Sequence, residues 1–232
     1  MATNTSPWIN YVSPWFALSP LQVLALTAYL ENRGGGIVGM QSVINVIQNR
    51  ALYPLTGGYA DPDIYDATGS MYFAVCLMQA QFSSYNLGNS QRGIALSLDT
   101  PAAFNAELQV NLSLRNAWNL CQKLQAGTLP DITGGANHYF AVTIPVPLWA
   151  SNMVYRTTIA GQSFYSASPY ISQNPQSFIP TIANAGSTVP VANPSSPSGY
   201  SSAPLPSGSS TASTANPEAL AVTIPSSIIG AL

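Results

Sequence analysis

The stretch that decides the fold covers residues 26–50 and reads LTAYLENRGGGIVGMQSVINVIQNR. An apolar run precedes Glu31, and three consecutive glycines at positions 34–36 follow it. Apolar residues recur at helical spacing on both sides of these glycines, which predicts two core helices joined by a flexible loop. Because glycine commonly ends a helix, the first helix is expected to stop just past Glu31. Glu31 is therefore expected in the last turn of a buried helix.

The start of this first helix carries its own signals. Ser19 fits the N-cap, Pro20 fits the first helical position, and Gln22 fits the reciprocal partner of a capping box. The second helix is expected over residues 38–50. It ends on Arg50, whose positive charge suits the carbonyl end of the helix dipole.

Glu31 has the position of a general acid. A negative charge at a helix C-terminus is disfavoured by roughly 0.3–1 kcal/mol, and partial burial beside Leu30 disfavours it further. Both effects raise the pKa of the carboxyl, and a carboxylic acid that stays protonated near neutral pH can protonate a leaving oxygen. The alternative is that Glu31 is solvated at the helix end or paired with Arg33 or Arg50.

Four motifs in a fixed order carry a family resemblance. They are Tyr29-x-Glu31-x-Arg33-Gly34 with Gly39, Val43, Val46-Ile47 and Asn49-Arg50; then Gln81-Phe82-Ser83; then Thr133-Gly134-Gly135-Ala136-Asn137-His138-Tyr139; and finally Pro147-x-Trp149 with Gly161-x-x-Phe164-Tyr165. They resemble the motifs of the SleB/CwlJ-type cell wall hydrolases, the spore-cortex and phage enzymes that cleave peptidoglycan. The resemblance covers about residues 21–165. In one departure from the family pattern, Gly35 stands where members often carry a second Glu.

The expected helices and a small extended region around residues 133–140 suggest a lysozyme-like α+β catalytic domain over residues 19–165, mainly helical. The resemblance, together with the environment of Glu31, implies cleavage of the β-1,4 bond between N-acetylmuramic acid and N-acetylglucosamine, with Glu31 as the acid. The motifs supply no second carboxylate, which favours a lytic transglycosylase with a 1,6-anhydro product over a hydrolase. The alternative is a degenerate virion protein that only grips glycan, and Gly35 favours that alternative.

The candidate substrate-binding residues come from the same motifs and combine aromatic rings with polar groups. Rings stack on the apolar faces of sugars, while amides and hydroxyls bind sugar hydroxyls. The candidates are Tyr29, Arg50, Gln81, Phe82, Ser83, Thr133, His138, Tyr139 and Trp149. Structural roles stay open as alternatives: a capping cation for Arg50, a helix end for residues 81–83, and core packing for Trp149.

Composition limits the classes of partner. Charged residues make up 6% of the chain, against roughly 25% in typical soluble domains, and the formal net charge is -2. Such a chain has little electrostatic means of binding nucleic acid or anionic lipid, so neither is an expected partner. Cys76 and Cys121 are expected to be buried thiols, and together with the single histidine, His138, they are too few for a zinc site. We predict neither a metal nor a cofactor.

The N-terminal segment, residues 1–18, combines aromatic side chains with Pro7 and Pro14. These interleaved prolines predict an extended aromatic arm rather than a helix. The bulky side chains need to be covered, and packing back onto the domain would cover them. Contact with another chain is the alternative.

Downstream of the core stretch, loops and helices are expected to alternate. The expected elements are a loop over residues 51–69, a short helix over residues 70–81 and the longest helix over residues 100–127. Thr100 fits the N-cap of the longest helix. Residues 133–139 are expected to form a Gly-rich turn leading into a short extended segment, in which His138 and Tyr139 point to opposite faces.

Residues 166–232 differ sharply in composition, being rich in Ser, Pro, Gly and Ala. They predict a long irregular tail with alternating apolar residues at Leu220, Val222 and Ile224. We expect this tail to anchor the protein on another virion protein, with residues 219–232 as an added strand; a disordered linker is the alternative.

Targeting signals are also missing from the sequence pattern. No basic N-terminal region followed by an apolar run is present, and no apolar stretch approaches the roughly 18 residues that a membrane helix needs. The expected location is therefore a virion or the host cytoplasm, with the bacterial cell wall as the site of action.

Overall fold

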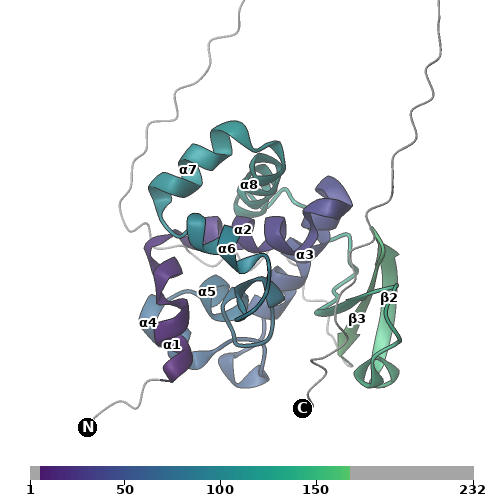
Figure 1. Ribbon diagram of the computed structural model, residues 1–232. Coiled ribbons are helices and arrows are strands. Elements are labelled where there is room, and N and C mark those ends of the chain that lie inside the picture. Colours follow the sequence, from purple (N-terminus) through teal and green to yellow (C-terminus); the bar gives the residue numbers. More distant parts are fainter. Residues whose placement is uncertain (1–5, 168–232) are drawn as a thin grey trace, which may run out of the picture. The chain divides into compact units, whose positions relative to one another are not determined.

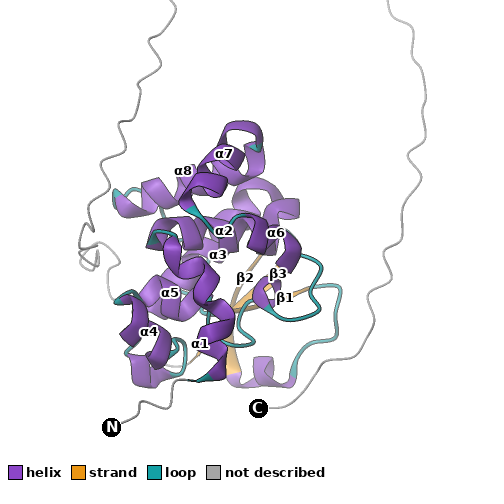
Figure 2. Cartoon of the chain, turned by 60° about the vertical axis from the view of Figure 1, so that its left-hand side comes forward, coloured by secondary structure: helices purple, strands orange, loops and turns teal. Residues whose placement is uncertain are grey.

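The computed structural model describes residues 6–167, which form a set of helices with a small antiparallel sheet beside them (Figure 1). Helices make up most of this part of the chain, as the purple and orange colouring of Figure 2 shows. The mixed helix-and-sheet class that the sequence predicts is thereby confirmed for these residues. The predicted tail lies outside the described residues from position 168 onward.

The two helices of the core stretch are α2, Pro20–Asn32, and α3, Gly36–Ala51. The capping box of Ser19 and Gln22 is present, so the predicted start of α2 is confirmed. Every residue of α2 between positions 21 and 30 is buried, which makes it a central helix with no solvent face. In place of a flexible loop, a short 3-10 turn, η2 (Arg33–Gly35), joins α2 to α3.

The N-terminal segment is helical, so the prediction of an extended arm over residues 1–18 is wrong for its described part. It forms α1, Pro7–Val12, and the 3-10 helix η1, Ser13–Ala17. Each proline occupies the first turn of its helix, where the missing N–H breaks no hydrogen bond. The expected packing onto the domain is confirmed, since Trp15 is fully buried.

The middle of the chain contains more helix than predicted. Its elements are η3 (Leu55–Gly57), α4 (Pro62–Thr68), α5 (Met71–Cys76), η4 (Ser83–Tyr85), α6 (Arg92–Ser97), α7 (Pro101–Val110) and α8 (Leu112–Gln125). The expected loop over residues 51–69 is therefore wrong, because Asp61 accepts hydrogen bonds from the first turn of α4 and caps it. The expected long helix breaks at Asn111, which has extended backbone angles and caps α8 with its side chain.

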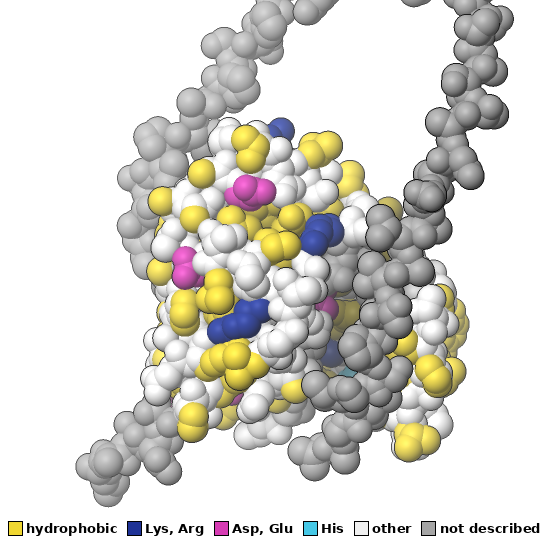
Figure 3. All heavy atoms as spheres, in the orientation of Figure 1, with side chains coloured by type: hydrophobic (Ala, Val, Ile, Leu, Met, Phe, Trp, Pro, Cys, Tyr) yellow, Lys and Arg dark blue, Asp and Glu magenta, His cyan; other side chains and the backbone are white. Residues whose placement is uncertain are grey.

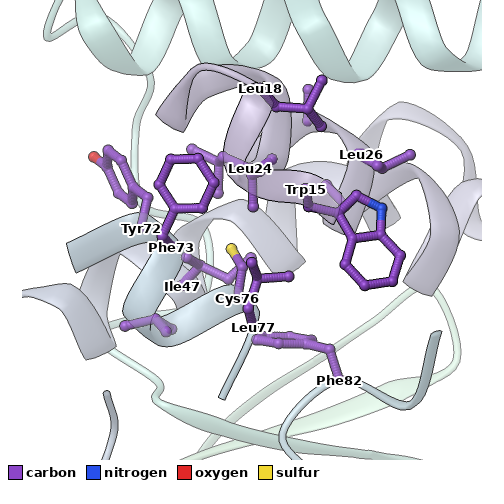
Figure 4. Close-up of a cluster of buried hydrophobic side chains, with 14 of the residues drawn as sticks. Trp15, Leu18, Leu24, Leu26, Ile47, Tyr72, Phe73, Cys76, Leu77 and Phe82 are labelled. Atoms are coloured by element: carbon purple, nitrogen blue, oxygen red, sulfur yellow. The ribbon is translucent and has the colours of Figure 1, made fainter. Parts of the chain in front are cut away.

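Buried apolar side chains from several segments form one hydrophobic core. Figure 4 shows Trp15 of η1, Leu24 of α2, Ile47 of α3 and Phe73 of α5 in this cluster. Cys76 lies among them as a buried free thiol, and Cys121 on α8 is buried in the same way, as predicted. Within residues 6–167, no helix is both long enough and apolar enough to cross a membrane.

The sheet contains β1 (His138–Ala141), β2 (Met153–Ile159) and β3 (Gln162–Ala167), with the 3-10 helix η5 (Leu148–Asn152) before β2. The strand order is β1-β3-β2, and both pairings are antiparallel. β3 continues past the expected domain boundary at residue 165, so the start of the predicted tail is corrected to beyond Ala167.

One face of the sheet packs against α3. Phe164 of β3 is fully buried there beside Val46 of α3 and Ala136, with Tyr139 of β1 against the same cluster. Residues directly opposite each other in adjacent strands share a face. The register Tyr139↔Phe164 therefore places Tyr139 on this inner face, and the alternation of a strand places His138 on the outer face.

Candidate active site

The candidate acid, Glu31, lies in the last turn of α2 as the sequence predicts, and its side chain is half-buried. Its Oε1 atom accepts two hydrogen bonds from Ser84, one from the amide N at 3.1 Å and one from Oγ at 2.5 Å. Ser84 is fixed in the 3-10 turn η4, which follows the extended backbone of Phe82. A segment far along the chain thus holds one carboxyl oxygen from two directions.

The pKa of Glu31 is raised above the ordinary value of 4.5, mainly because burial removes water from the carboxyl. Hydrogen bonds from Ser84 lower the pKa in part, and the hydroxyl of Tyr139 and the charge of Arg50 lower it less. The predicted direction of the shift is confirmed. Arg33 and Arg50 have other hydrogen-bond partners, because Arg33 donates to Gln91 and Arg50 donates to Asn137 and Gln81.

Arg50, at the end of α3, is buried and held by groups from two distant segments. Its Nε donates to the carbonyl of Asn137 at 2.7 Å, and its Nη1 donates to Oε1 of Gln81 at 2.8 Å. The guanidinium carbon lies 5.4 Å from the ring centroid of Phe82, within cation–π range. The structure therefore brings three of the candidate residues, Arg50, Gln81 and Phe82, together. Phe82 is 1% exposed, however, which makes it a packing residue rather than a surface for a ligand.

Tyr139 lies on the inner face of the sheet and contacts the Glu31 carboxyl with its hydroxyl. Burial raises the pKa of Tyr139, and the negative charge of Glu31 raises it further. The phenol therefore keeps its proton and can donate it in a hydrogen bond to the ionised carboxylate. Glu31, Ser84, Tyr139 and Arg50 form the centre of the candidate site.

Thr133 has a structural role, which corrects its assignment to substrate binding. It is fully buried, and its N and Oγ1 both donate to Oδ1 of Asp131, at 2.7 and 2.6 Å. Oδ2 of Asp131 accepts from Gly135 N at 2.8 Å and from Asn49 Nδ2 at 3.1 Å. Gly134 and Gly135 both have positive φ, which glycine adopts at no steric cost. Asp131 thus organises the turn that leads into β1.

Asn137 connects the elements around the site, a role that sequence reasoning missed. Its Oδ1 accepts from the amide of Ala167 at 3.2 Å, and its Nδ2 donates to the hydroxyl of Tyr53 at 3.1 Å. Its own carbonyl is the acceptor for Arg50. Its place inside the Thr133–Tyr139 motif was the signal in the sequence, whereas the full burial of its amide, which requires hydrogen-bond partners, is visible only in the structure.

Ser83 and Tyr29 do not line the site. Ser83 is exposed, and its neighbour Ser84 makes the contact with Glu31. Tyr29 is buried on α2, where its hydroxyl accepts from Asn111 Nδ2 at 3.0 Å and its ring packs under Arg33. Two residues along a helix point to nearly opposite sides, so Tyr29 faces away from Glu31.

His138 and Trp149 lie on the outer face of the sheet, with ring centroids 5.3 Å apart. Burial and the charge of Arg50 lower the pKa of His138 to about 4, so its imidazole is neutral at neutral pH. Figure 3 shows that yellow hydrophobic and white uncharged groups make up most of the visible surface, with scattered dark blue and magenta side chains. The charge of Arg50 thus reaches His138, although His138 lies on the face of the sheet opposite Tyr139.

The described residues contain no group of three or more His, Cys, Asp or Glu side chains that could hold a metal ion. Comparison of the chain with protein-family models, with curated proteins and with solved structures found no match. Function has to be inferred from the site itself and from the motifs in the sequence.

Proposed function

We propose that this chain cleaves peptidoglycan at the bond between N-acetylmuramic acid and N-acetylglucosamine, as a lysozyme-like member of the SleB/CwlJ-type cell wall hydrolases. The observation that carries the proposal is the environment of Glu31. Burial favours the protonated acid, and both hydrogen bonds from Ser84 reach Oε1. The proton of the neutral acid therefore belongs on Oε2, from which it can pass to the glycosidic oxygen.

A single carboxylate is enough for a lytic transglycosylase. Glu31 protonates the leaving oxygen as the glycosidic bond breaks and becomes a carboxylate. It then takes the proton of the muramyl 6-hydroxyl while that oxygen bonds to C1, which closes a 1,6-anhydro ring and restores the acid. Between these steps, the charge of Arg50 and the hydroxyl of Tyr139 favour the ionised form of Glu31.

A second carboxylate at the position of the family's other Glu has no room in this structure. A Cβ added at Gly35 would lie 2.6 Å from Oδ1 of Asn32 and 2.9 Å from Cβ of Ala160. Asp131, the acid nearest in sequence to the motif turn, is occupied by hydrogen bonds within that turn. Retaining glycosidases that use a nucleophile place two carboxyls about 5 Å apart, so these observations favour transglycosylation over hydrolysis.

The test is Glu31→Gln, which keeps the size and the acceptor for Ser84 but has no transferable proton. Cleavage of purified peptidoglycan should fall by about 100-fold or more, because general acid catalysis typically contributes that much. The thermal unfolding midpoint reports whether the fold is retained. Cleavage by the variant within a few-fold of wild type would show that Glu31 is not the acid.

The products distinguish the two reactions. Mass spectrometry of the released fragments should show 1,6-anhydromuramyl ends and no new reducing muramic acid ends. Reducing ends would mean that a water molecule is activated by a second carboxylate, and the transglycosylase mechanism would be wrong.

A second candidate function is glycan binding without cleavage. The lack of room for a side chain at position 35, where the family often carries a second Glu, favours this candidate. A wild-type chain that binds purified peptidoglycan but gives no clearing in a zymogram would support this candidate. Phage origin and attachment to a virion through residues beyond Ala167 stay predictions from the sequence.

A further inference from the structure

The outer face of the sheet carries a row of aromatic side chains at matching positions in all three strands. Tyr155 of β2 is opposite Tyr165 of β3, and Tyr165 is opposite His138 of β1. Since opposite residues share a face, these three rings point away from α3, on the side opposite Tyr139 and Phe164. Their hydrophobic surface is not used in the core of the domain.

Ring contacts make this row continuous. The centroids of Tyr155 and Tyr165 are 5.5 Å apart, and Trp149 of η5 lies 5.8 Å from Tyr165 and 5.3 Å from His138. Beyond His138, the ring of Tyr59 follows at 5.5 Å. We call Tyr155, Tyr165, Trp149, His138 and Tyr59 the aromatic row. Tyr155 is 53% exposed, and the other four are half-buried.

The aromatic row is neutral and is edged by hydroxyl groups. The hydroxyl of Tyr155 pairs with Oγ1 of Thr158 at 2.9 Å, which in turn pairs with Oγ of Ser163 at 3.2 Å. His138 carries no charge at neutral pH. Arg156, at the bulge in β2, turns to the inner face, where its Nε donates to Ser166. Aromatic rings beside hydroxyls, without charge, match the apolar faces and hydroxyl edges of neutral sugars.

One end of the aromatic row lies within reach of the charge of Arg50, which belongs to the candidate site. The charge of Arg50 acts on Tyr59 and on His138, and the same charge acts on Glu31. From there the row continues across β1 and β3 to Tyr155 at the sheet edge formed by β2. A polymer that lies along the row would therefore have one end near Arg50, on the way to Glu31.

We propose that the aromatic row is a binding surface for the sugar rings of a glycan strand, which extends the substrate site from Glu31 across the outer face of the sheet. This inference rests on the proposed function for its direction toward Glu31. Stacking on several rings would bind several sugar units of the strand in addition to the two that flank the cleaved bond. The enzyme is thereby expected to prefer long strands to short fragments.

The test uses the full chain with Glu31→Gln, so that binding is measured without cleavage. Co-sedimentation with purified, insoluble peptidoglycan gives the affinity of this parent and of Tyr155→Ala and Trp149→Ala made in it. Each ring removal should weaken binding roughly three- to tenfold, the equivalent of one aromatic contact. Tyr155→Phe keeps the ring and should bind more tightly than Tyr155→Ala.

Leu148→Ala is the matched control, because Leu148 is 93% exposed, apolar and adjacent to Trp149 but has no ring. It should bind like the parent. If Leu148→Ala weakens binding as much as Tyr155→Ala, the rings have no special role, the surface is a general apolar patch, and the proposal is wrong. Normal binding by both ring variants also overturns it. Should Trp149→Ala fail to fold, the exposed Tyr155 still decides the result.

These outcomes are separate from those for the proposed function. If the wild-type chain does not cleave peptidoglycan but its binding depends on the aromatic row, the proposed enzymatic function is wrong and the proposed binding surface stands. If cleavage depends on Glu31 but both ring variants bind normally, the proposed enzymatic function stands and the proposed binding surface is wrong.

Discussion

Ser84→Ala tests the environment of Glu31 most directly. In the structure the amide N and the Oγ of Ser84 both donate to Oε1 of Glu31. The substitution removes the 2.5 Å hydrogen bond from Oγ and leaves the backbone one in place. Ser83→Ala is the matched control, because Ser83 lies in the same 3-10 turn but is exposed.

The size of the effect follows from the charge on the acceptor. A hydrogen bond to a charged group contributes about 1.5–3 kcal/mol, against about 0.5–1.5 kcal/mol for a neutral pair. Removing the Oγ donor therefore disfavours the carboxylate relative to the neutral acid by about 1 kcal/mol. Because burial already raises the pKa of Glu31 and Ser84 lowers it, the substitution raises this pKa further.

The assay is the rate of peptidoglycan cleavage as a function of pH. A general acid acts only while it is protonated, so kcat/KM falls on the alkaline side as Glu31 ionises. We expect Ser84→Ala to move this alkaline limb to higher pH and Ser83→Ala to leave it in place. An unchanged limb in a folded Ser84→Ala protein would refute the reasoning, because Ser84 would then not be bonded to the catalytic carboxyl.

Three further predictions concern stability. Gly35→Ala should lower the free energy of unfolding by about 1–3 kcal/mol through overpacking. Gly34→Ala is the control and should be tolerated, because a Cβ added at Gly34 meets no atom within 4 Å. Thermal unfolding of both variants checks this. Asp131→Ala removes the acceptor of the turn before β1 and should cost about 2–4 kcal/mol, whereas the exposed Asp66→Ala should be nearly neutral in the same denaturant titration. Because the pKa of Glu31 is raised, the folded chain keeps a proton on this carboxyl at pH values where the unfolded chain has lost it. The contribution of this protonated carboxyl to stability is therefore present below about pH 4.5 and is lost as the pH rises through the folded-state pKa. The unfolding midpoint of Glu31→Gln should therefore rise relative to wild type over that pH interval, and a constant difference between the two proteins would contradict the shift.

Local features of the chain were predictable where neighbouring residues decide the conformation. The capping box of Ser19 and Gln22 starts α2, and the glycines after Asn32 allow the turn that ends it. The place of Glu31 in the last turn follows from these two ends alone. The alternation of His138 and Tyr139 in a strand was also correct, because it follows from strand geometry.

Errors arose where one residue type can serve two local purposes. Pro7 and Pro14 were interpreted as helix breakers, but each occupies the first turn of a helix, where proline is favourable. Asn111 interrupts the predicted long helix because its side chain caps α8 and its amide contacts the Tyr29 hydroxyl. Contacts of this kind with a distant helix are not encoded in a local pattern.

The sequence by itself determined the candidate acid, the helix that carries it and the place where that helix ends. Only the tertiary structure decided which groups surround that acid. Ser84 is 53 positions from Glu31, and its selection over Ser83 depends on how η4 docks beside α2. The pairing of β1 with β3 likewise decides that Tyr139 faces Glu31 while His138 faces outward. Local energies set helix ends and strand alternation, whereas burial, which shifts the pKa of Glu31, arises only when distant segments pack together.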